Sequence, residues 1–321
     1  MKIRENMPVY RIGIDLGGTN IKAGVVSADN QLLASYSCKT LVQRPWREVV
    51  ADMAMAAGKA AETLGISLAD CVSCGVGSPG TVNAANGMVI YSNNFDWENI
   101  PLGETLSELM QMPVKVSNDA NCAALGECVA GAAKDVSSAV LLTLGTGVGG
   151  GVVFDGKVFE GGPGGAELGH TCIVGGGELC TCGRKGCLEA YASATALIRE
   201  ASRAATVYPE SSMNELLKEY GGEMNGIIPF SAAQSGDAVA TAVVERYIDW
   251  LGKGIVDLVN IFRPEVVLLA GGVCAQGENL TKPLTAMVKE YAFGGARVAS
   301  PEVKIAALGN DAGILGAANL I

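Results

Sequence analysis

The 321-residue sequence is short of several residue types, and each shortage argues against a class of function. It has one histidine, so no pair of histidines is available for acid–base catalysis. Charged residues make up only 17% of the chain and apolar residues 49%, which predicts a large packed core rather than disorder. The net charge is −10, and a chain without a basic excess is not suited to neutralising nucleic-acid phosphates.

Long apolar runs are also missing. No stretch approaches the roughly 18 uninterrupted apolar residues of a membrane helix. The richest runs, Ala139–Leu144 and Val266–Ala270, have the length of strands, and the first residues contain no signal-peptide stretch. We therefore expect a soluble cytoplasmic protein without a membrane partner, in which clustered members of the ten cysteines bind metal rather than form disulfides.

Glycine, in contrast, is abundant, and the 43 glycines cluster at a few places. Apolar runs and turn residues predict strands over 10–16, 21–27, 31–39, 71–77, 114–116, 138–144 and 265–270. They predict helices over 46–64, 193–206, 211–220, 237–262 and 311–320, and one that begins near Asp119. Strands followed by helices predict an α/β fold. The order strand, glycine loop, strand occurs twice, about 130 residues apart, which suggests two related domains facing each other.

Two glycine-rich motifs are candidates for phosphate binding. In DLGGTNIKAG, residues 15–24, backbone N–H groups can approach a phosphate while the carboxylate of Asp15 faces Mg²⁺. A β-hairpin turn with a solvated Asp15 explains the same residues equally well. In LGTGVGGG, residues 144–151, the match to GxGxxG is a weak sign of dinucleotide binding, because a strand and not a helix is expected next. A second phosphate clamp, in a glycine turn over 145–151, fits better.

Asp119 lies in SNDAN, where a predicted helix begins after a strand. A carboxylate there can act as a general base for a hydroxyl, and the positive end of the helix favours its ionised form. Asp is also an ordinary helix N-cap, and the residues alone favour the capping role.

The sharpest pattern consists of His170, Cys180, Cys182 and Cys187. Three thiolates and one imidazole are a complete tetrahedral zinc set, and the loops between them are short enough to converge. Disulfide pairing is the alternative, but Cys180 and Cys182 are poorly placed to pair and a reducing compartment opposes oxidation. Four protein ligands leave no position for a catalytic water, so we expect a structural zinc ion.

Two carboxylates flank this cluster. Glu167 precedes His170 by three residues and Glu189 follows Cys187 by two. Carboxylates accept hydrogen bonds and an imidazole N–H donates one, so these side chains can bind several sugar hydroxyls. Two surface carboxylates in loops explain them equally well.

Together these segments resemble the ROK family of bacterial sugar kinases and related repressors. DLGGTNIKAG is similar to the family's first phosphate motif, LGTGVGGG to its second, and LAGGV, residues 269–273, to its adenosine motif. GGAELGH and CTCGRKGCLE, within residues 164–189, resemble the family signature, which is highly specific. The resemblance extends from about Tyr10 to the end of the chain.

The resemblance implies the actin-like ATPase (ribonuclease H-like) fold, with two α/β domains around a cleft. The small domain would cover 1–117 and include a C-terminal helix over 305–321; the large domain would cover 118–304 and contain the zinc loop. Asp119 would deprotonate the primary hydroxyl of a sugar, which attacks the γ-phosphate of MgATP, so catalysis now outweighs capping. The residues implied for the sugar are Ser78, Gly80, Asn94, Asn118, Asp119, Glu167, His170 and Glu189. Those implied for ATP and Mg²⁺ are Asp15, Gly17, Gly18, Thr19, Asn20, Lys22, Gly145, Thr146, Gly147, Gly271 and Gly272.

The implied activity is ATP-dependent phosphorylation of a hexose, with glucose as the expected substrate. Kinases for N-acetylmannosamine, N-acetylglucosamine, fructose or allose differ in pocket shape and stay open as alternatives. A sugar-sensing repressor of the family would carry several dozen DNA-binding residues before the first phosphate motif, where eight residues precede Val9, so it is not favoured. Asn83 and Ser117 replace the Asp and Glu that are frequent in the family, and we expect them to affect substrate preference. A homodimer or homotetramer is expected by analogy.

Overall fold

The computed structural model describes residues 9–321, and these residues form two compact units. Unit 1 comprises the chain up to Ala139, Gly151–Ala166 and Ala307–Ile321. Unit 2 comprises Val140–Gly150 and Glu167–Ala306. The domain boundaries predicted at residues 117 and 304 are a different division and stay a prediction. Within the described residues, no helix combines the length and the apolar character that crossing a membrane requires.

Unit 1 is built on a five-stranded sheet with the order β3-β2-β1-β4-β8. Its strands are β1 (Tyr10–Leu16), β2 (Asn20–Ser27), β3 (Leu32–Lys39), β4 (Cys71–Ser78) and β8 (Val114–Asn118). The first three form an antiparallel meander, as their apolar runs and polar turns predict, and β4 and β8 run parallel to β1. The carboxyl ends of β1, β4 and β8 therefore meet at one edge of the sheet.

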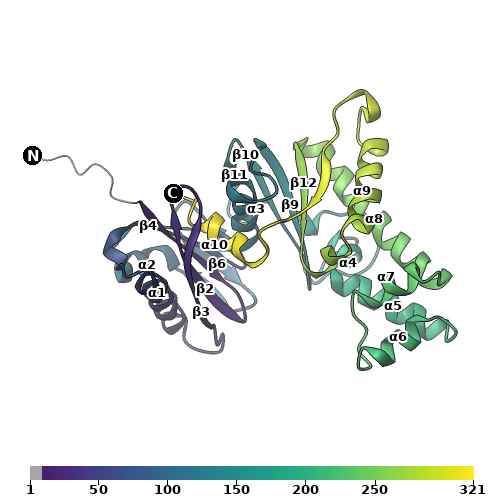
Figure 1. The fold of residues 1–321 in the computed structure, drawn as a ribbon, viewed down its shortest axis with the longest axis horizontal. Coiled ribbons are helices and arrows are strands. Elements are labelled where there is room, and N and C mark those ends of the chain that lie inside the picture. The colour runs from purple at the N-terminus through teal and green to yellow at the C-terminus, as the bar shows by residue number, and fades with distance from the viewer. Residues whose placement is uncertain (1–8) are drawn as a thin grey trace, which may run out of the picture. The chain divides into compact units, whose positions relative to one another are not determined.

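Helices cover both faces of this sheet (Figure 1). Helices α1 (Trp46–Thr63) and α2 (Leu102–Met110) pack on one face, and α3 (Asp119–Ala130) and α10 (Ala312–Ala317) pack on the other. The predicted C-terminal glycine of the first helix is confirmed, since Gly65 has φ +69°.

Glycines explain how closely α10 approaches its neighbours. A Cβ on Gly75 of β4 would lie 1.7 Å from the carbonyl oxygen of Ala317. A Cβ on Gly316 of α10 would lie 1.6 Å from the carbonyl oxygen of Cys122 in α3. Any larger residue at either position would push α10 away, so part of the glycine content serves backbone packing and not ligand binding.

A small sheet of unit 1, with the order β5-β6-β7, was not expected from the sequence. Its strands are β5 (Thr81–Asn83), β6 (Met88–Ser92) and β7 (Trp97–Ile100). They are short, and Trp97 of β7 and Phe95 of the turn before it are buried in the core of unit 1.

A second five-stranded sheet has the order β11-β10-β9-β12-β13. Its strands are β9 (Ser138–Leu144), β10 (Val148–Phe154), β11 (Lys157–Val158), β12 (Val266–Ala270) and β13 (Glu302–Ile305). The hairpin predicted around Asp155 and Gly156 is confirmed, because both residues have the positive φ of a tight hairpin turn. The glycine turn predicted over 145–151 is too long: β10 begins at Val148, so only Gly145–Gly147 form the turn.

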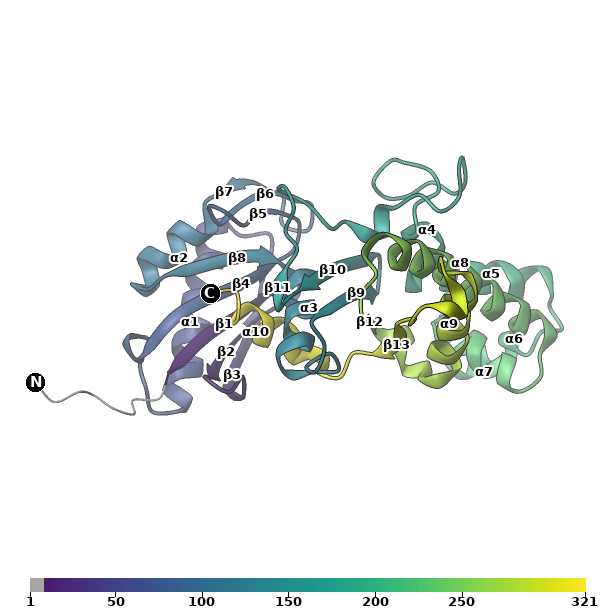
Figure 2. The same ribbon diagram turned by 90° about the horizontal axis from the view of Figure 1, so that it is seen from above.

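The helices of unit 2 pack beside one another (Figure 2). They are α4 (Glu189–Ala192), α5 (Ala194–Val207), α6 (Met213–Glu219), α7 (Ile228–Gln234), α8 (Ala238–Phe262) and α9 (Glu278–Tyr291). The apolar stripe predicted for the long helix is confirmed, since Tyr247, Leu251 and Ile255 are buried. Helices α2, α4, α7 and α9 and strand β13 were not predicted.

Candidate active site

The carboxyl ends of the parallel strands of unit 1 bring predicted site residues together. Asp15 of β1 pairs with Gly77 of β4, and Ser78 of β4 pairs with Asn118 of β8. Asp15 also faces Lys22 across the β1–β2 hairpin. Ligands of open α/β sheets bind at such strand ends, so the topology itself indicates where a site lies in this unit.

The first glycine turn connects β1 to β2. The Gly17 N–H donates to the Asn20 carbonyl at 3.0 Å, and the Thr40 hydroxyl donates to the Gly17 carbonyl at 2.6 Å. Gly18 and Thr19, at the tip, are exposed. The turn is thus held from below while its tip remains accessible to a ligand.

Asn118 and not Asp119 caps α3. The Asn118 side-chain oxygen accepts from the N–H groups of Ala120 and Asn121, at 2.9 and 3.4 Å. Its amide nitrogen donates to the Gly80 carbonyl at 3.2 Å and so ties the helix start to the turn after β4. The capping interpretation of Asp119 is therefore wrong. Asp119 is the first residue of the helix, and its carboxylate accepts from the Ala120 N–H at 2.9 Å.

Burial has the largest effect on the pKa values of Asp15 and Asp119, the two carboxylates of unit 1 that were predicted for the site. It raises the pKa of Asp119 above its usual value, although hydrogen bonds from Ala120 and Asn118 oppose the shift. Burial likewise raises the pKa of Asp15 to about 6, with Lys22 lowering it and the charge of Asp119 raising it. The helix end was expected to favour the ionised form of Asp119; its N–H groups do so, but burial outweighs them.

The other residues of unit 1 that were predicted for the sugar differ in their burial and in the turns that carry them. Ser78 is fully buried at the end of β4. Gly80 has φ +96°, and a Cβ there would lie 2.3 Å from the Tyr91 carbonyl oxygen, so only glycine fits this turn. Asn94 is exposed in the turn between β6 and β7.

A buried polar network beneath the start of α3 was missed from the sequence. The Ser117 hydroxyl donates to Glu160 Oε1 at 2.7 Å, and the Asn121 amide donates to Glu160 Oε2 at 3.4 Å. Burial raises the pKa of Glu160, and these hydrogen bonds lower it in part. The only sequence signal was Ser117 itself, which stands where the family frequently has Glu; the structure supplies a carboxylate at this place from Glu160.

Glu127, also missed, joins the other end of α3 to the chain that returns to α10. Its carboxylate accepts from the N–H groups of Ala132, Ala307 and Leu308 at 2.8, 3.0 and 2.8 Å. The side chain is fully buried. Three backbone donors satisfy the hydrogen-bonding needs of this buried carboxylate. Glu127 therefore joins the chain just after α3 to the segment that leads into α10.

In unit 2 the second glycine loop, Gly145–Gly147, follows β9. The Gly145 N–H donates to the Gly147 carbonyl at 3.0 Å, and Gly145 and Thr146 are exposed. Gly271, after β12, has φ +104°, and a Cβ on it would lie 2.2 Å from the carbonyl oxygen of Leu144. This close approach places the predicted adenosine turn, Gly271 and Gly272, beside the end of the strand that leads into the loop.

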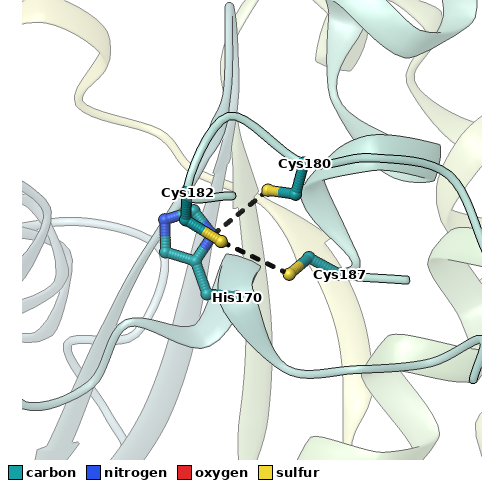
Figure 3. Close-up of side chains that lie close together, drawn as sticks. All are labelled: His170, Cys180, Cys182 and Cys187. Atoms are coloured by element: carbon teal, nitrogen blue, oxygen red, sulfur yellow. Dashed lines mark hydrogen bonds between the residues drawn. The ribbon is translucent and has the colours of Figure 1, made fainter. Parts of the chain in front are cut away.

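The predicted metal ligands converge in unit 2 (Figure 3). One ligand atom from each of His170, Cys180, Cys182 and Cys187 lies within 4.8 Å of all the others. Cys180 Sγ is 3.5 Å from His170 Nδ1, and Cys182 Sγ is 3.7 Å from Cys187 Sγ. Tetrahedral zinc, with bonds of about 2.3 Å to sulfur and about 2.0 Å to nitrogen, separates two sulfurs by about 3.8 Å and sulfur from nitrogen by about 3.5 Å.

These distances also decide against the disulfide alternative. A disulfide joins two sulfurs at about 2.05 Å. All ten cysteines are free. The four side chains therefore fit a zinc ion in both the type and the spacing of their donor atoms. We call the segment 167–189 that carries them the metal-binding knot.

The two flanking carboxylates differ in their surroundings. Glu167 is exposed and precedes the short turn Leu168–His170, where its carbonyl accepts from the His170 N–H at 3.0 Å. Glu189 is half-buried and engaged: it accepts from the Thr181 hydroxyl at 2.5 Å and from the Val148 N–H at 3.1 Å. Nothing in the local sequence pattern predicted that Thr181 would donate a hydrogen bond to Glu189.

Comparisons with known proteins agree with this arrangement. The model of the ROK family matches residues 11–321. The chain belongs to the ROK family. It is 38% identical over 315 residues to a glucokinase of Halalkalibacterium halodurans, covering 97% of this chain and 94% of that protein. It is 39% identical over 315 residues to a glucokinase of Thermotoga maritima, covering 97% and 96%.

A solved structure is also similar to this ROK protein over almost its whole length. The ROK family glucokinase from Streptomyces griseus, in complex with glucose and AMPPNP, superposes with a TM-score of 0.79 at 35% identity, covering 97% of this chain and 98% of that one. The predicted actin-like ATPase fold is confirmed by this likeness. The expectation of a glucokinase-type ROK sugar kinase is confirmed by the full-length similarities.

Proposed function

We propose that the protein transfers the γ-phosphoryl group of ATP to the primary hydroxyl of glucose, forming glucose 6-phosphate and ADP. The carrying observation is Asp119, a partly buried carboxylate that does not serve as the helix cap. It is the first residue of α3 and directly follows β8, in the same sheet as the strands that end at Asp15 and Ser78. The relative whose structure contains glucose and AMPPNP supports both substrates.

In the proposed reaction Asp119 accepts the proton of the sugar hydroxyl. The hydroxyl oxygen then forms a bond to the γ-phosphorus, and the bond from that phosphorus to the β–γ bridging oxygen breaks, leaving ADP. A base works best when its pKa lies nearer to the working pH, and burial moves the pKa of Asp119 in that direction. When bound, Mg²⁺ neutralises the phosphate charges; Asp15 is the carboxylate we assign to it.

We assign ATP to three glycine-rich turns. The first is Gly17–Lys22, with Thr19 and Asn20 at its tip and base, and the second is Gly145–Gly147, with Thr146 exposed. The third, Gly271 and Gly272, takes the adenosine. The assignment is supported by the close approach of Gly271 to Leu144, which keeps the last two turns adjacent within unit 2.

We assign the sugar to the residues that the resemblance to the family implies, which besides Asp119 are Ser78, Gly80, Asn94, Asn118, Glu167, His170 and Glu189. The hydrogen bond from Asn118 to the Gly80 carbonyl supports a common role for these two, because it fixes the turn after β4 relative to Asp119.

We further propose that the metal of the knot is zinc and that its role is structural. Three thiolates and an imidazole fill all four positions of a tetrahedral ion, so no position is left for substrate or water. Reduced thiols fit a reaction in the cytoplasm, where we place the protein. A homodimer or homotetramer stays a prediction, which sedimentation of the purified chain would test.

The test of the function is an ADP-release assay with glucose, N-acetylmannosamine, N-acetylglucosamine, fructose and allose. We expect glucose to have the highest kcat/KM. Since pocket shape decides between epimers and acetylated sugars, a higher value for another sugar would move the assignment to that substrate. Absence of ADP release with every sugar would refute a sugar kinase.

A further inference from the structure

The metal-binding knot and the second glycine loop lie against each other in unit 2. Gly169 packs so closely that a Cβ on it would lie 2.0 Å from the Val148 carbonyl oxygen. Leu168 contacts Gly150 in the same way, since a Cβ on Gly150 would lie 2.6 Å from Leu168 Cγ. The turn that ends in the metal ligand His170 therefore rests directly on the strand that follows the loop.

Glu189 connects the knot to the loop through both of its carboxylate oxygens. Oε1 accepts from the Thr181 hydroxyl at 2.5 Å and lies 3.4 Å from Cys180 Sγ. Oε2 accepts from the Val148 N–H at 3.1 Å. A Cβ on Gly147 would lie 2.3 Å from the same Oε2, so the carboxylate occupies the space beside the loop.

A second connection runs through the backbone just after Glu189. The Ala194 N–H donates to the Gly145 carbonyl at 2.9 Å. The loop is thus held at Gly145 by the start of α5 and at Gly147 and Val148 by Glu189. Both holding groups follow the last metal ligand, Cys187, by only a few residues.

Thr181 is placed where a bound metal would fix it. It stands between two ligands, Cys180 and Cys182, and is exposed. Ligation of both neighbours fixes its backbone, and a fixed backbone aims its hydroxyl at Glu189. Residues that orient a site in this way are commonly as important as those that touch the ligand.

We propose that Glu189 is a positioning residue for the nucleotide, and that Thr181 makes nucleotide affinity depend on metal occupancy of the knot. Metal loss frees Thr181, Glu189 then loses one partner, and the Val148 N–H and the loop before it lose their support. The proposal rests on the proposed function, in which Gly145–Gly147 hold the phosphates of ATP.

The test measures binding of Mg²⁺–AMPPNP and of glucose separately, by isothermal titration calorimetry, on the full chain. The samples are zinc-loaded wild type, chelator-stripped wild type, the same protein reloaded with zinc, Thr181→Val and Thr181→Ser. The valine variant removes the hydroxyl and keeps the shape; the serine variant keeps the hydroxyl and is the matched control. Metal analysis of each sample gives its zinc content.

We expect Thr181→Val to raise the Kd of AMPPNP about three- to tenfold, the loss of one hydrogen bond of ordinary net strength. Its zinc content should match wild type, and Thr181→Ser should restore the nucleotide affinity. Stripping zinc should raise the Kd of AMPPNP at least as much as Thr181→Val does, and reloading should reverse the change.

Unchanged nucleotide affinity in both Thr181→Val and stripped protein would overturn the proposal, as would a loss confined to glucose. If Thr181→Val itself loses zinc, stripping and reloading of wild type alone decides the matter. Failure of the proposed function looks different: wild type would then bind neither AMPPNP nor glucose and release no ADP.

Discussion

The start of α3 in unit 1 and the metal-binding knot in unit 2 hold their functional side chains by opposite means. At α3 the holding is done by strand pairing and a helix cap, with Ser78 paired to Asn118 and Asn118 bonded to Ala120. In the knot, regular structure before α4 is limited to the turn Leu168–His170 and two isolated bridges. In the metal site that we propose, four ligands to one ion would replace the missing strands and helices.

This difference teaches which substitutions alter shape and which alter only chemistry. A side chain that protrudes from a well-paired scaffold can be changed without loss of the fold. A side chain that is itself the holding element cannot, because metal binding and local folding are the same event.

The largest expected effect is the loss of a metal ligand. Cys187→Ser replaces a fully buried thiol, and we expect bound zinc to fall to near zero and the knot to lose its structure. Structural zinc contributes about 10–16 kcal/mol of apparent binding energy in small zinc-dependent folds. Cys172→Ser is the matched control, because Cys172 is an exposed thiol of the same segment outside the ligand set. Equal metal loss in both variants, measured by mass spectrometry, would contradict the assignment.

At the other region we expect a large change in rate with no change in fold. Asp119→Asn removes the base and should lower kcat by about 10²–10⁴-fold. Zinc content should stay at the wild-type value and the melting temperature should not fall, because the change removes a carboxylate whose pKa burial raises. Asp155→Asn is the control, since Asp155 lies in a hairpin turn at φ +49°, a conformation that Asn tolerates. Turnover near wild type in Asp119→Asn would disprove the role of Asp119.

Glu127→Ala tests whether unit 1 also contains a side chain on which the local fold depends. The change leaves three backbone N–H groups without their acceptor, and it removes a fully buried carboxylate. We expect the free energy of unfolding in urea to fall by about 3–5 kcal/mol. Glu108→Ala, on the exposed side of α2, should change it little. Equal stability of the two variants would mean that other contacts suffice to hold the connection.

The smallest effect concerns the charge of Asp15. Burial raises the pKa of Asp15 to about 6. Between about pH 4 and pH 6 this carboxyl therefore keeps its proton in the folded chain and has lost it in the unfolded chain. Stability from this group therefore falls as pH rises through that window. Asp15→Asn should match wild type near pH 4 and exceed it by about 1–2 kcal/mol at pH 7, after allowance for partial solvent screening. Parallel urea stabilities of the two proteins from pH 4 to 7 would be inconsistent with a buried Asp15 charge.

What could be predicted from the sequence follows the range of the interactions. The strands before Asp15 and Asp119, and the zinc ligands, were predictable because each rests on residues within about 20 positions of one another. The helix cap shows the limit: Asn118 and Asp119 are both good caps, and only the backbone geometry shows that Asn118 takes the role.

Long-range partners were out of reach. Glu127 bonds to Leu308, 181 positions away, and Glu160 bonds to Ser117, 43 positions away. Neither pairing leaves a periodic or local pattern in the sequence. The short strands β5–β7 were missed for a related reason: at three to five residues they are too short to show alternation, and tertiary packing defines them.

The glycine-lined seat of α10 has a consequence for the order in which the chain folds during synthesis. Arg11, in the first strand to be made, donates to Asn319, which is added 308 positions later. While the ribosome is still making the helices of unit 2, the face of the first sheet around Gly13 and Gly75 stays open to water. The unit that begins first thus finishes last, and until then the glycines that receive α10 lack their partner helix.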